Sequence, residues 1–312
     1  METSLANPAT PAYVTKMKDA VSGTGAAGRI LDAPPPLAWW HLTSLDAPTV
    51  AVVWTIAFAW AARVALPAWV PALLALAAWS VYIGDRLLDA RAARLTNQLR
   101  RLRLRHHFHW RHRRILFPLA LVSACAAVVL VSCFMPMAAV ERNSVLGAAA
   151  VAYFSGVHSP RRFRPLLFRL LAKEALVAIL FTAACVLPTV SRVLVQVPAH
   201  AATALLPLCA MAFFFTLLAW LNCHAIERWE SSDAPSLSGV CARALVLASL
   251  GLVLAVILVA TRSPRAAGVI CAGATSAFLL ALLDRRRERL SPLALRATAD
   301  LVLLTPLVAL LQ

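Results

Sequence analysis

The chain has few charged residues, and acidic residues are the scarcest of them. Only 14% of its 312 residues are Asp, Glu, Lys or Arg, whereas a soluble domain has about 25%. Apolar residues make up 61% of the chain, above the roughly 45–50% of soluble proteins. Because so little polar surface cannot cover a water-soluble fold, the composition predicts a polytopic membrane protein.

Two further features are missing from the sequence. It lacks the alternating segments of about ten residues that membrane β-barrels need, and its seven cysteines form no Cys-x-x-Cys pair. Long runs of Leu, Ala and Val are present instead, and in lipid such runs form helices, because a helix satisfies its own backbone polar groups. We therefore expect an all-α transmembrane helical bundle with reduced cysteines and no disulfide framework.

The apolar runs are long enough to cross a membrane several times. A crossing helix needs about 20 apolar residues, and fewer where neighbouring protein or thinned lipid accommodates it. Residues 1–45, rich in Ala, Pro and Thr, predict a disordered cytoplasmic tail, with an interfacial anchor at Trp39, Trp40 and His41. Residues 46–312 then form one domain of nine predicted spans: 47–66, 67–84, 115–137, 144–158, 174–190, 201–221, 241–261, 266–283 and 294–311.

The positive charge of the chain is distributed unevenly. The formal net charge is +16, but the basic residues lie between apolar segments and not on one soluble module, which argues against nucleic acid as a partner. The tail and every second loop hold 25 of the 30 Lys and Arg residues. Because basic loops remain in the cytoplasm, we expect the N-terminus on the cytoplasmic side of the cytoplasmic (inner) membrane. Anionic membrane lipid is the expected partner of these loops.

The first candidate site is the pair Asp85 and Asp89, at the cytoplasmic end of the second predicted span. Four residues apart on a helix, the two carboxylates can face one cavity. Oxygen ligands of this kind suit Mg²⁺, which takes one or two carboxylates together with water and substrate phosphates. The alternative is that both carboxylates are solvated and ion-paired with the arginines beside them, Arg86, Arg91 and Arg94.

A second polar cluster ends the sixth predicted span at the same membrane face. It contains Asn222, Glu227 and Glu230, and a helix places the first about 80° and the second about 60° from the third around its axis. Two acidic clusters at one face suit Mg²⁺ ions that bridge a diphosphate and neutralise the charge on a leaving group. We therefore treat the two clusters as halves of one site.

Candidate anion-binding residues lie between the two clusters. Tyr153 ends the fourth predicted span and is followed by Arg161 and Arg162, and Lys173 precedes the fifth. Guanidinium and ammonium groups suit phosphate oxygens. A basic rim that contacts anionic lipid is the alternative.

Two other groups of polar residues predict structural roles. Arg296 and Asp300 are four residues apart in the last predicted span, so we expect them to form an ion pair inside the bundle. The histidine-rich run from His106 to His112 predicts an amphipathic connector at the membrane surface.

The arrangement resembles the UbiA superfamily of intramembrane prenyltransferases, which have nine helices and two Asp-rich motifs at the cytoplasmic ends of the second and sixth. The first family motif reads roughly Asn-x-x-x-Asp-x-x-x-Asp. In this chain Asp85-Arg86-Leu87-Leu88-Asp89 is similar to its first half, and Ala93 stands in the last Asp position. The second motif has its counterpart in the Asn222–Glu230 cluster, where the oxygens match with a one-residue slip.

The resemblance implies a function and residue roles. The family moves an isoprenyl group from an allylic diphosphate to a lipophilic, often aromatic, acceptor with the help of Mg²⁺. Four carboxylates would then hold the metal at the catalytic centre, and five other residues would bind the diphosphate or the prenyl chain. The carboxylates are Asp85, Asp89, Glu227 and Glu230, and the substrate-binding residues are Arg161, Arg162, Lys173, Tyr153 and Asn222.

Other functions stay open at this point. Ala93 and the irregular second motif also fit a UbiA-like protein that binds or carries an isoprenoid lipid without catalysis. A CDP-alcohol phosphotransferase would need glycines and further Asp residues around Ala90 and Arg91, and the sequence lacks them. A transporter would need paired helices interrupted by Gly or Pro at matching depths.

Overall fold

The computed structural model describes residues 32–95, 104–158, 173–196, 201–230 and 239–311. Within these ranges the structure contains helices and no strands, which confirms the all-α class expected from the sequence. Residues 1–31 of the expected N-terminal tail lie outside the described part of the chain. Residues 35–42, which the sequence placed in the same tail, form a helix, so the ordered chain begins before residue 46.

The described residues form helices that follow one another in chain order. They are α2 (Pro35–Leu42), α3 (Asp46–Ala61), α4 (Trp69–Leu95), α5 (Leu104–Arg111), α6 (Arg113–Phe134), α7 (Met137–His158), α9 (Lys173–Gln196), α10 (Ala201–Glu230), α11 (Val240–Ala260), α12 (Pro264–Arg286), η4 (Arg287–Arg289), α13 (Pro292–Leu301), η5 (Val302–Leu304) and α14 (Pro306–Leu310).

Seven helical segments of the described chain are long and apolar enough to cross a membrane, so the protein is a multi-pass membrane protein. They are α4, α6, α9, α10, α11, α12 and the α13–α14 segment. The other two predicted spans, 47–66 and 144–158, correspond to α3 and α7. With 16 residues α3 is short, and it reaches span length only together with α2. The α7 sequence includes Glu141, Arg142 and Asn143, which lower its apolar content.

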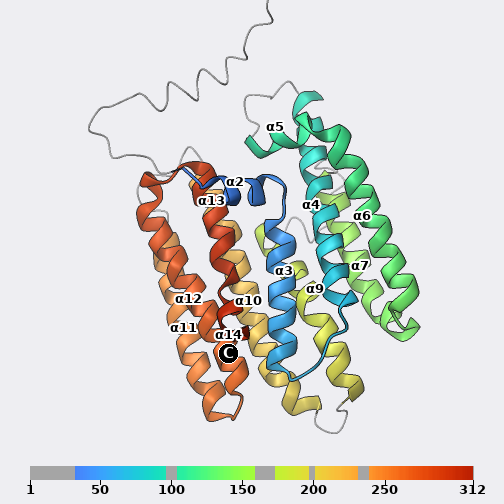
Figure 1. The fold of residues 1–312 in the computed structure, drawn as a ribbon. Helices are drawn as coiled ribbons and strands as arrows, with labels where there is room; N and C mark the ends of the chain where they lie inside the picture. Colours follow the sequence, from blue (N-terminus) through green and yellow to red (C-terminus); the bar gives the residue numbers. More distant parts are fainter. Residues whose placement is uncertain (1–31, 96–103, 159–172, 197–200, 231–238, 312) are drawn as a thin grey trace, which may run out of the picture. The chain divides into compact units, whose positions relative to one another are not determined.

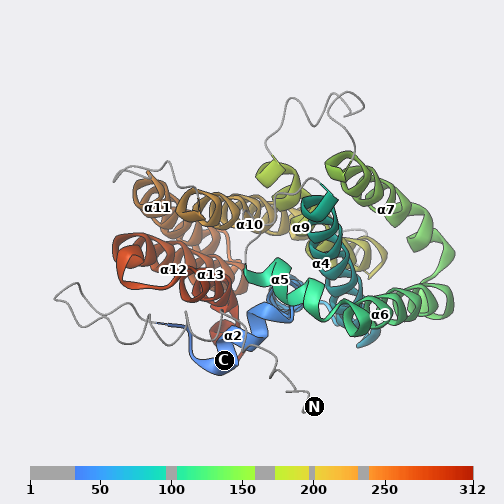
Figure 2. The ribbon, with the colours of Figure 1, turned by 90° about the horizontal axis from the view of Figure 1, so that it is seen from above.

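The helix α3 lies at the centre of the contacts within the described helices. It packs against α4, α9, α12 and α14. Figures 1 and 2 show α11 and α12 side by side at one edge of the helix set, with α6 and α7 at the other. The helix α9 packs along α10 and also contacts α7 and α4, so these four helices meet around α9.

An aromatic core joins α3 to α10. The indole ring of Trp54 stacks on Phe215 with the ring centroids 3.8 Å apart, and both side chains are fully buried. The Nε1–H group of Trp54 donates a hydrogen bond of 2.9 Å to the carbonyl of Leu303. This bond satisfies the one polar atom of the ring and ties α3 to the C-terminal segment.

Two helices extend past the apolar layer. The helix α4 has 27 residues and α10 has 30, which correspond to about 40 and 45 Å at 1.5 Å per residue. The hydrocarbon core of a bilayer is only about 30 Å thick. Both helices are therefore longer than a crossing requires.

The chain bends by 88° between α2 and α3. Ser44, at this corner, has a positive φ of 61°, a backbone conformation that is costly for residues other than glycine. Such conformations persist where the surrounding structure holds them in place. The corner is held by buried polar groups of His41, Ser44 and Asp46, which are described below.

The close approach of α11 to α12 depends on a glycine. A Cβ atom at Gly251 would lie 2.8 Å from the Cβ of Ala274 and 2.8 Å from the ring of Phe214. We expect Gly251→Ala to destabilise the protein by about 1–3 kcal/mol, as overpacking of a core does, and to lower the unfolding temperature measured in detergent.

Gly268 of α12 provides the matched control, since a Cβ atom there meets nothing within 4 Å. Gly268→Ala is expected to leave the unfolding temperature unchanged or to raise it, because alanine favours the helix by up to about 1 kcal/mol. Equal effects of the two substitutions would contradict the packing described.

Candidate functional site

Carboxylates from α4 and α9 meet at a tyrosine of α7. The phenol of Tyr153 lies within electrostatic range of the carboxylates of Asp85, Asp89 and Glu174. The two aspartates are half-buried on α4, and Glu174 is half-buried in the first turn of α9. The charges that act on Tyr153 therefore include those of Asp85 and Asp89, two other residues that the sequence singled out.

The same cluster continues onto α10. The carboxyl groups of Glu174 and Glu227 form a hydrogen bond with each other, and Lys173 lies within electrostatic range of Glu174 and of Cys223. Such a pair of carboxyl groups can share a proton or a cation, which relieves the repulsion between two carboxylates. We call the set Asp85, Asp89, Tyr153, Glu174 and Glu227 the acidic cluster.

Glu230 and Asn222 take part in other contacts. Glu230 forms an ion pair of 2.5 Å with Arg296 of α13. The spacing within α13 predicted that Arg296 would pair with Asp300, whereas among the described residues its ion-pair partner is Glu230. Asn222 is buried and donates its Nδ2–H to Asp300 Oδ1 over 3.0 Å. Both contacts fasten α10 to α13.

The remaining predicted residues are not all visible in the structure. Arg161 and Arg162 lie outside the described residues, and the same is true of the side chain of Phe154 beside Tyr153. Lys173 is described and exposed at the start of α9. Of the predicted cationic residues for diphosphate, Lys173 is thus the one that the structure locates.

A second polar group is enclosed where the α2–α3 corner meets α13. It consists of His41, Asp46, Arg86, Asn222 and Asp300, which we call the corner cluster. Nδ1 of His41 lies 2.6 Å from Asp46 Oδ2 and 3.6 Å from Asp300 Oδ2. The sequence assigned His41 to an interfacial anchor, whereas the structure shows it only 1% exposed.

Arg86 belongs to the corner cluster and not to the carboxylates beside it in sequence. Its guanidinium lies 3.7 Å from Asp46 Oδ2, donates to the carbonyl of His41 over 3.3 Å and hydrogen-bonds Ser44 Oγ. The same Ser44 hydroxyl hydrogen-bonds His109 of α5 over 2.9 Å. The histidine-rich connector therefore turns one face, with His106 and His109, into the protein.

Sequence reasoning missed three residues of the two clusters. Glu174 and Asp46 were not among the candidate residues, and His41 was assigned to an interfacial anchor. The available signal was the scarcity of acids, since an Asp at the start of an apolar helix, such as Asp46, requires a partner. The partner itself comes from another helix and leaves no mark in the local sequence.

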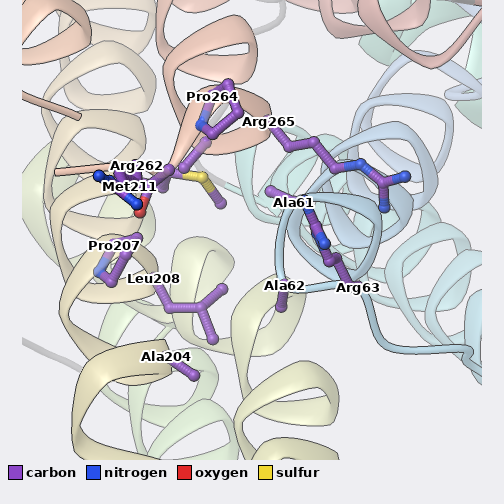
Figure 3. Close-up of a pocket in the computed structure, with 12 residues that line it drawn as sticks. Ala61, Ala62, Arg63, Ala204, Pro207, Leu208, Met211, Arg262, Pro264 and Arg265 are labelled. Atoms are coloured by element: carbon purple, nitrogen blue, oxygen red, sulfur yellow. The ribbon is translucent and has the colours of Figure 1, made fainter. Parts of the chain in front are cut away.

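A pocket of about 260 Å³ lies at the C-terminal end of α3 and the N-terminal ends of α10 and α12. Its lining includes Arg63, Arg262 and Arg265. Figure 3 shows the side chains of Arg262 and Arg265 running in opposite directions, and Arg265 lies over the ring of Trp60 at 5.2 Å and donates to its carbonyl. These cations do not converge on one point, so this pocket is a weaker candidate site than the acidic cluster.

Comparison with protein-family models, with curated proteins and with solved structures found no match to the chain.

Removal of the buried guanidinium tests the corner cluster. Arg86→Met keeps much of the side-chain volume but leaves the carboxylate of Asp46 without its cation, and breaking a buried pair costs about 3–5 kcal/mol. We expect a marked fall in the unfolding temperature in detergent. Arg91→Met, at an exposed position of the same helix, should have no such effect, and a similar fall in both variants would show that Arg86 is not a buried partner.

Proposed function

We propose that the protein is a Mg²⁺-dependent intramembrane prenyltransferase of the UbiA type. It would move an isoprenyl group from an allylic diphosphate to a lipophilic acceptor such as an aromatic compound, as the sequence resemblance implies. In this reaction the bond between the allylic carbon and the diphosphate oxygen breaks, the carbon bonds to the acceptor, and the acceptor releases a proton.

The acidic cluster carries this proposal. Asp85 and Asp89 of α4 share Tyr153 as a neighbour with Glu174 of α9, and Glu174 hydrogen-bonds Glu227 of α10. Carboxylates from three apolar helices thus gather near one place although the whole chain has only 14 acidic residues. Such a concentration inside a membrane protein is costly and is characteristic of functional sites.

The donor atoms fit Mg²⁺ in chemical type. The ion prefers carboxylate oxygens and keeps places for water and substrate phosphate, and the cluster offers oxygens from Asp85, Asp89, Glu174 and Glu227. When bound, Mg²⁺ supplies positive charge against the departing diphosphate. Glu230 is engaged by Arg296, so the proposal gives its place among the ligands to Glu174.

The side chains around the carboxylates would bind and orient the substrate. Lys173, exposed beside Glu174, is suited to hold diphosphate oxygens, together with Arg161 and Arg162, which precede it in the sequence. The ring of Tyr153 offers a π face to a developing allylic cation. Fixed charges in a water-poor site stabilise developing charge more strongly than they would in water.

The proposal includes the membrane arrangement that the charge pattern predicts. Counting α3 and α7 as crossings gives the nine spans of the UbiA type, with residues 46–312 as the catalytic domain and the N-terminus in the cytoplasm. Asp85 and Glu227 then lie at the cytoplasmic face of the inner membrane, where a water-soluble diphosphate is available. Cysteine accessibility mapping in intact cells would test this orientation.

Loss of one carboxylate should abolish most of the activity. We expect Asp89→Asn to lower kcat for Mg²⁺-dependent diphosphate release at least about 100-fold, the usual effect of removing one group that stabilises developing charge. The assay uses purified protein with a series of allylic isoprenyl diphosphates and an aromatic acceptor. Glu141→Gln is the control and should keep full activity, because Glu141 lies at the end of α7 far from Tyr153. An active Asp89→Asn variant would exclude the proposed site.

A lipid-binding protein without catalysis is the second candidate. Ala93, where the family motif has an Asp, and the engagement of Glu230 by Arg296 both reduce the number of available ligands. If this candidate is correct, a prenyl lipid should bind with the same affinity in EDTA and in Mg²⁺, measured by fluorescence with a labelled prenyl chain. For the transferase we expect binding of the diphosphate to weaken at least about tenfold in EDTA, because metal and diphosphate bind together.

A further inference from the structure

The corner cluster has the features of a metal site that is separate from the acidic cluster. One atom each of His41, Asp46 and Asp300 lies within 4.8 Å of the other two. The three residues come from α2, α3 and α13, so the fold brings them together from opposite ends of the chain. His41 and Asp46 are 1% and 2% exposed, so the group is enclosed by protein.

In each carboxylate Oδ2 is the oxygen nearer His41, and Oδ1 is held by another donor. Asp46 Oδ2 also lies 3.7 Å from the guanidinium of Arg86. Asp46 Oδ1 accepts a hydrogen bond of 2.9 Å from the backbone N–H of Ala47, and Asp300 Oδ1 accepts one of 3.0 Å from Asn222. The Oδ2 atoms are the ones near His41 Nδ1. Donors of this kind fix the orientation of carboxylate ligands at metal sites.

The distances between these atoms are compatible with three ligands of one ion. Nδ1 lies 2.6 Å from Asp46 Oδ2, yet it makes no hydrogen bond of acceptable geometry with any described group. A donor N–H must point at its acceptor, whereas two ligands both point at a third position. Ligands about 2.1 Å from one ion and at right angles are about 3.0 Å apart, and the observed 2.6 and 3.6 Å lie on either side of this value.

A second buried polar atom is also unsatisfied. Asn222 is 5% exposed, and its Oδ1 has no hydrogen-bond partner in the described part of the chain, although its Nδ2 holds Asp300. Leaving a buried polar atom unpaired costs about 1–3 kcal/mol. A metal ion at this place would accept an electron pair from the nitrogen of His41 and, directly or through water, from the oxygen of Asn222.

The charges of the cluster leave room for a cation. Asp46 and Asp300 carry two negative charges, and among the described contacts Arg86 supplies one positive charge to Asp46. From this balance and the geometry we infer that a divalent transition-metal ion binds between His41 Nδ1, Asp46 Oδ2 and Asp300 Oδ2. A proton on His41 is the competing way to balance the charge, and it predicts that no metal binds.

The ligand set indicates the kind of metal. One imidazole nitrogen with two carboxylate oxygens suits Mn²⁺, Fe²⁺ or Zn²⁺, whereas Mg²⁺ prefers oxygen alone. The side chain of Asp300 is 18% exposed, which gives an ion a path of entry. The bound ion would clamp the α2–α3 corner to α13. This inference does not depend on the proposed function, because the acidic cluster shares none of the three ligands.

Pulsed electron paramagnetic resonance with Mn²⁺ tests the site. The purified full chain is treated with EDTA, dialysed and given one equivalent of MnCl₂. We expect coupling of the manganese to an imidazole nitrogen, because a ligand nitrogen lies in its first coordination sphere. An ion in the acidic cluster would be surrounded by oxygen from Asp85, Asp89, Glu174 and Glu227. A spectrum without nitrogen coupling in the wild-type protein overturns the inference and leaves the proposed function untouched.

Two variants assign the nitrogen. His41→Gln should abolish the nitrogen coupling, whereas His224→Gln should keep it. His224 is the control because it lies within electrostatic range of Glu174 and could supply a nitrogen to an ion in the acidic cluster. Coupling that survives His41→Gln overturns the site. Asp300→Asn retains His41 and keeps a side chain of the same size that can form hydrogen bonds. It should weaken Mn²⁺ binding at least about tenfold. Unchanged Mn²⁺ binding in a variant with a wild-type elution profile would also overturn the proposed site.

Discussion

Charges that are enclosed among apolar helices need partners from the chain itself, and this requirement organises the structure around Arg86. Lipid offers no hydrogen bonds, so an unpaired guanidinium there costs several kcal/mol. Arg86 is 5% exposed and receives its partners from the α2–α3 corner. Through Asp46 and His41 the same contacts reach Asp300 of α13. The positions of α2, α3, α4 and α13 are thus coupled by one set of polar groups.

The helix α4 serves two polar clusters with different properties. Its Arg86 joins the enclosed corner cluster, while Asp85 and Asp89 join the acidic cluster near Tyr153. Tyr82, one turn earlier, is within electrostatic range of Asp46, Asp300 and Cys223. Four residues of the corner cluster are buried and Asp300 is partly buried, which suits a fixed structural role. The acidic cluster includes the exposed Glu227 and lies near the exposed Lys173, which suits a ligand that arrives from water.

Local properties of the fold were predictable from the sequence, and pairings between helices were not. Each predicted span overlaps a helix, and seven helical segments of the described chain are long and apolar enough to cross a membrane, because the length and polarity of a segment decide whether it is stable in lipid. The spacing of Arg296 and Asp300 showed that they share a face of one helix. It could not show that this face meets Glu230 and Asn222 of α10. For the same reason Asp85 and Asp89 were identified, whereas the contribution of Glu174 was not.

The corner between α2 and α3 also constrains the order in which the protein can assemble. Its partners lie near the other end of the chain, as the hydrogen bond from Trp54 to Leu303, 249 residues away, illustrates. Helices of a membrane protein enter the bilayer as the ribosome makes them, and contacts between distant residues form slowly. His41 and Asp46 must therefore wait, partly unsatisfied, until the last helical segment has been inserted. The α2–α3 corner is closed by the α13–α14 segment, and a nascent chain that stalls before this segment retains an open corner.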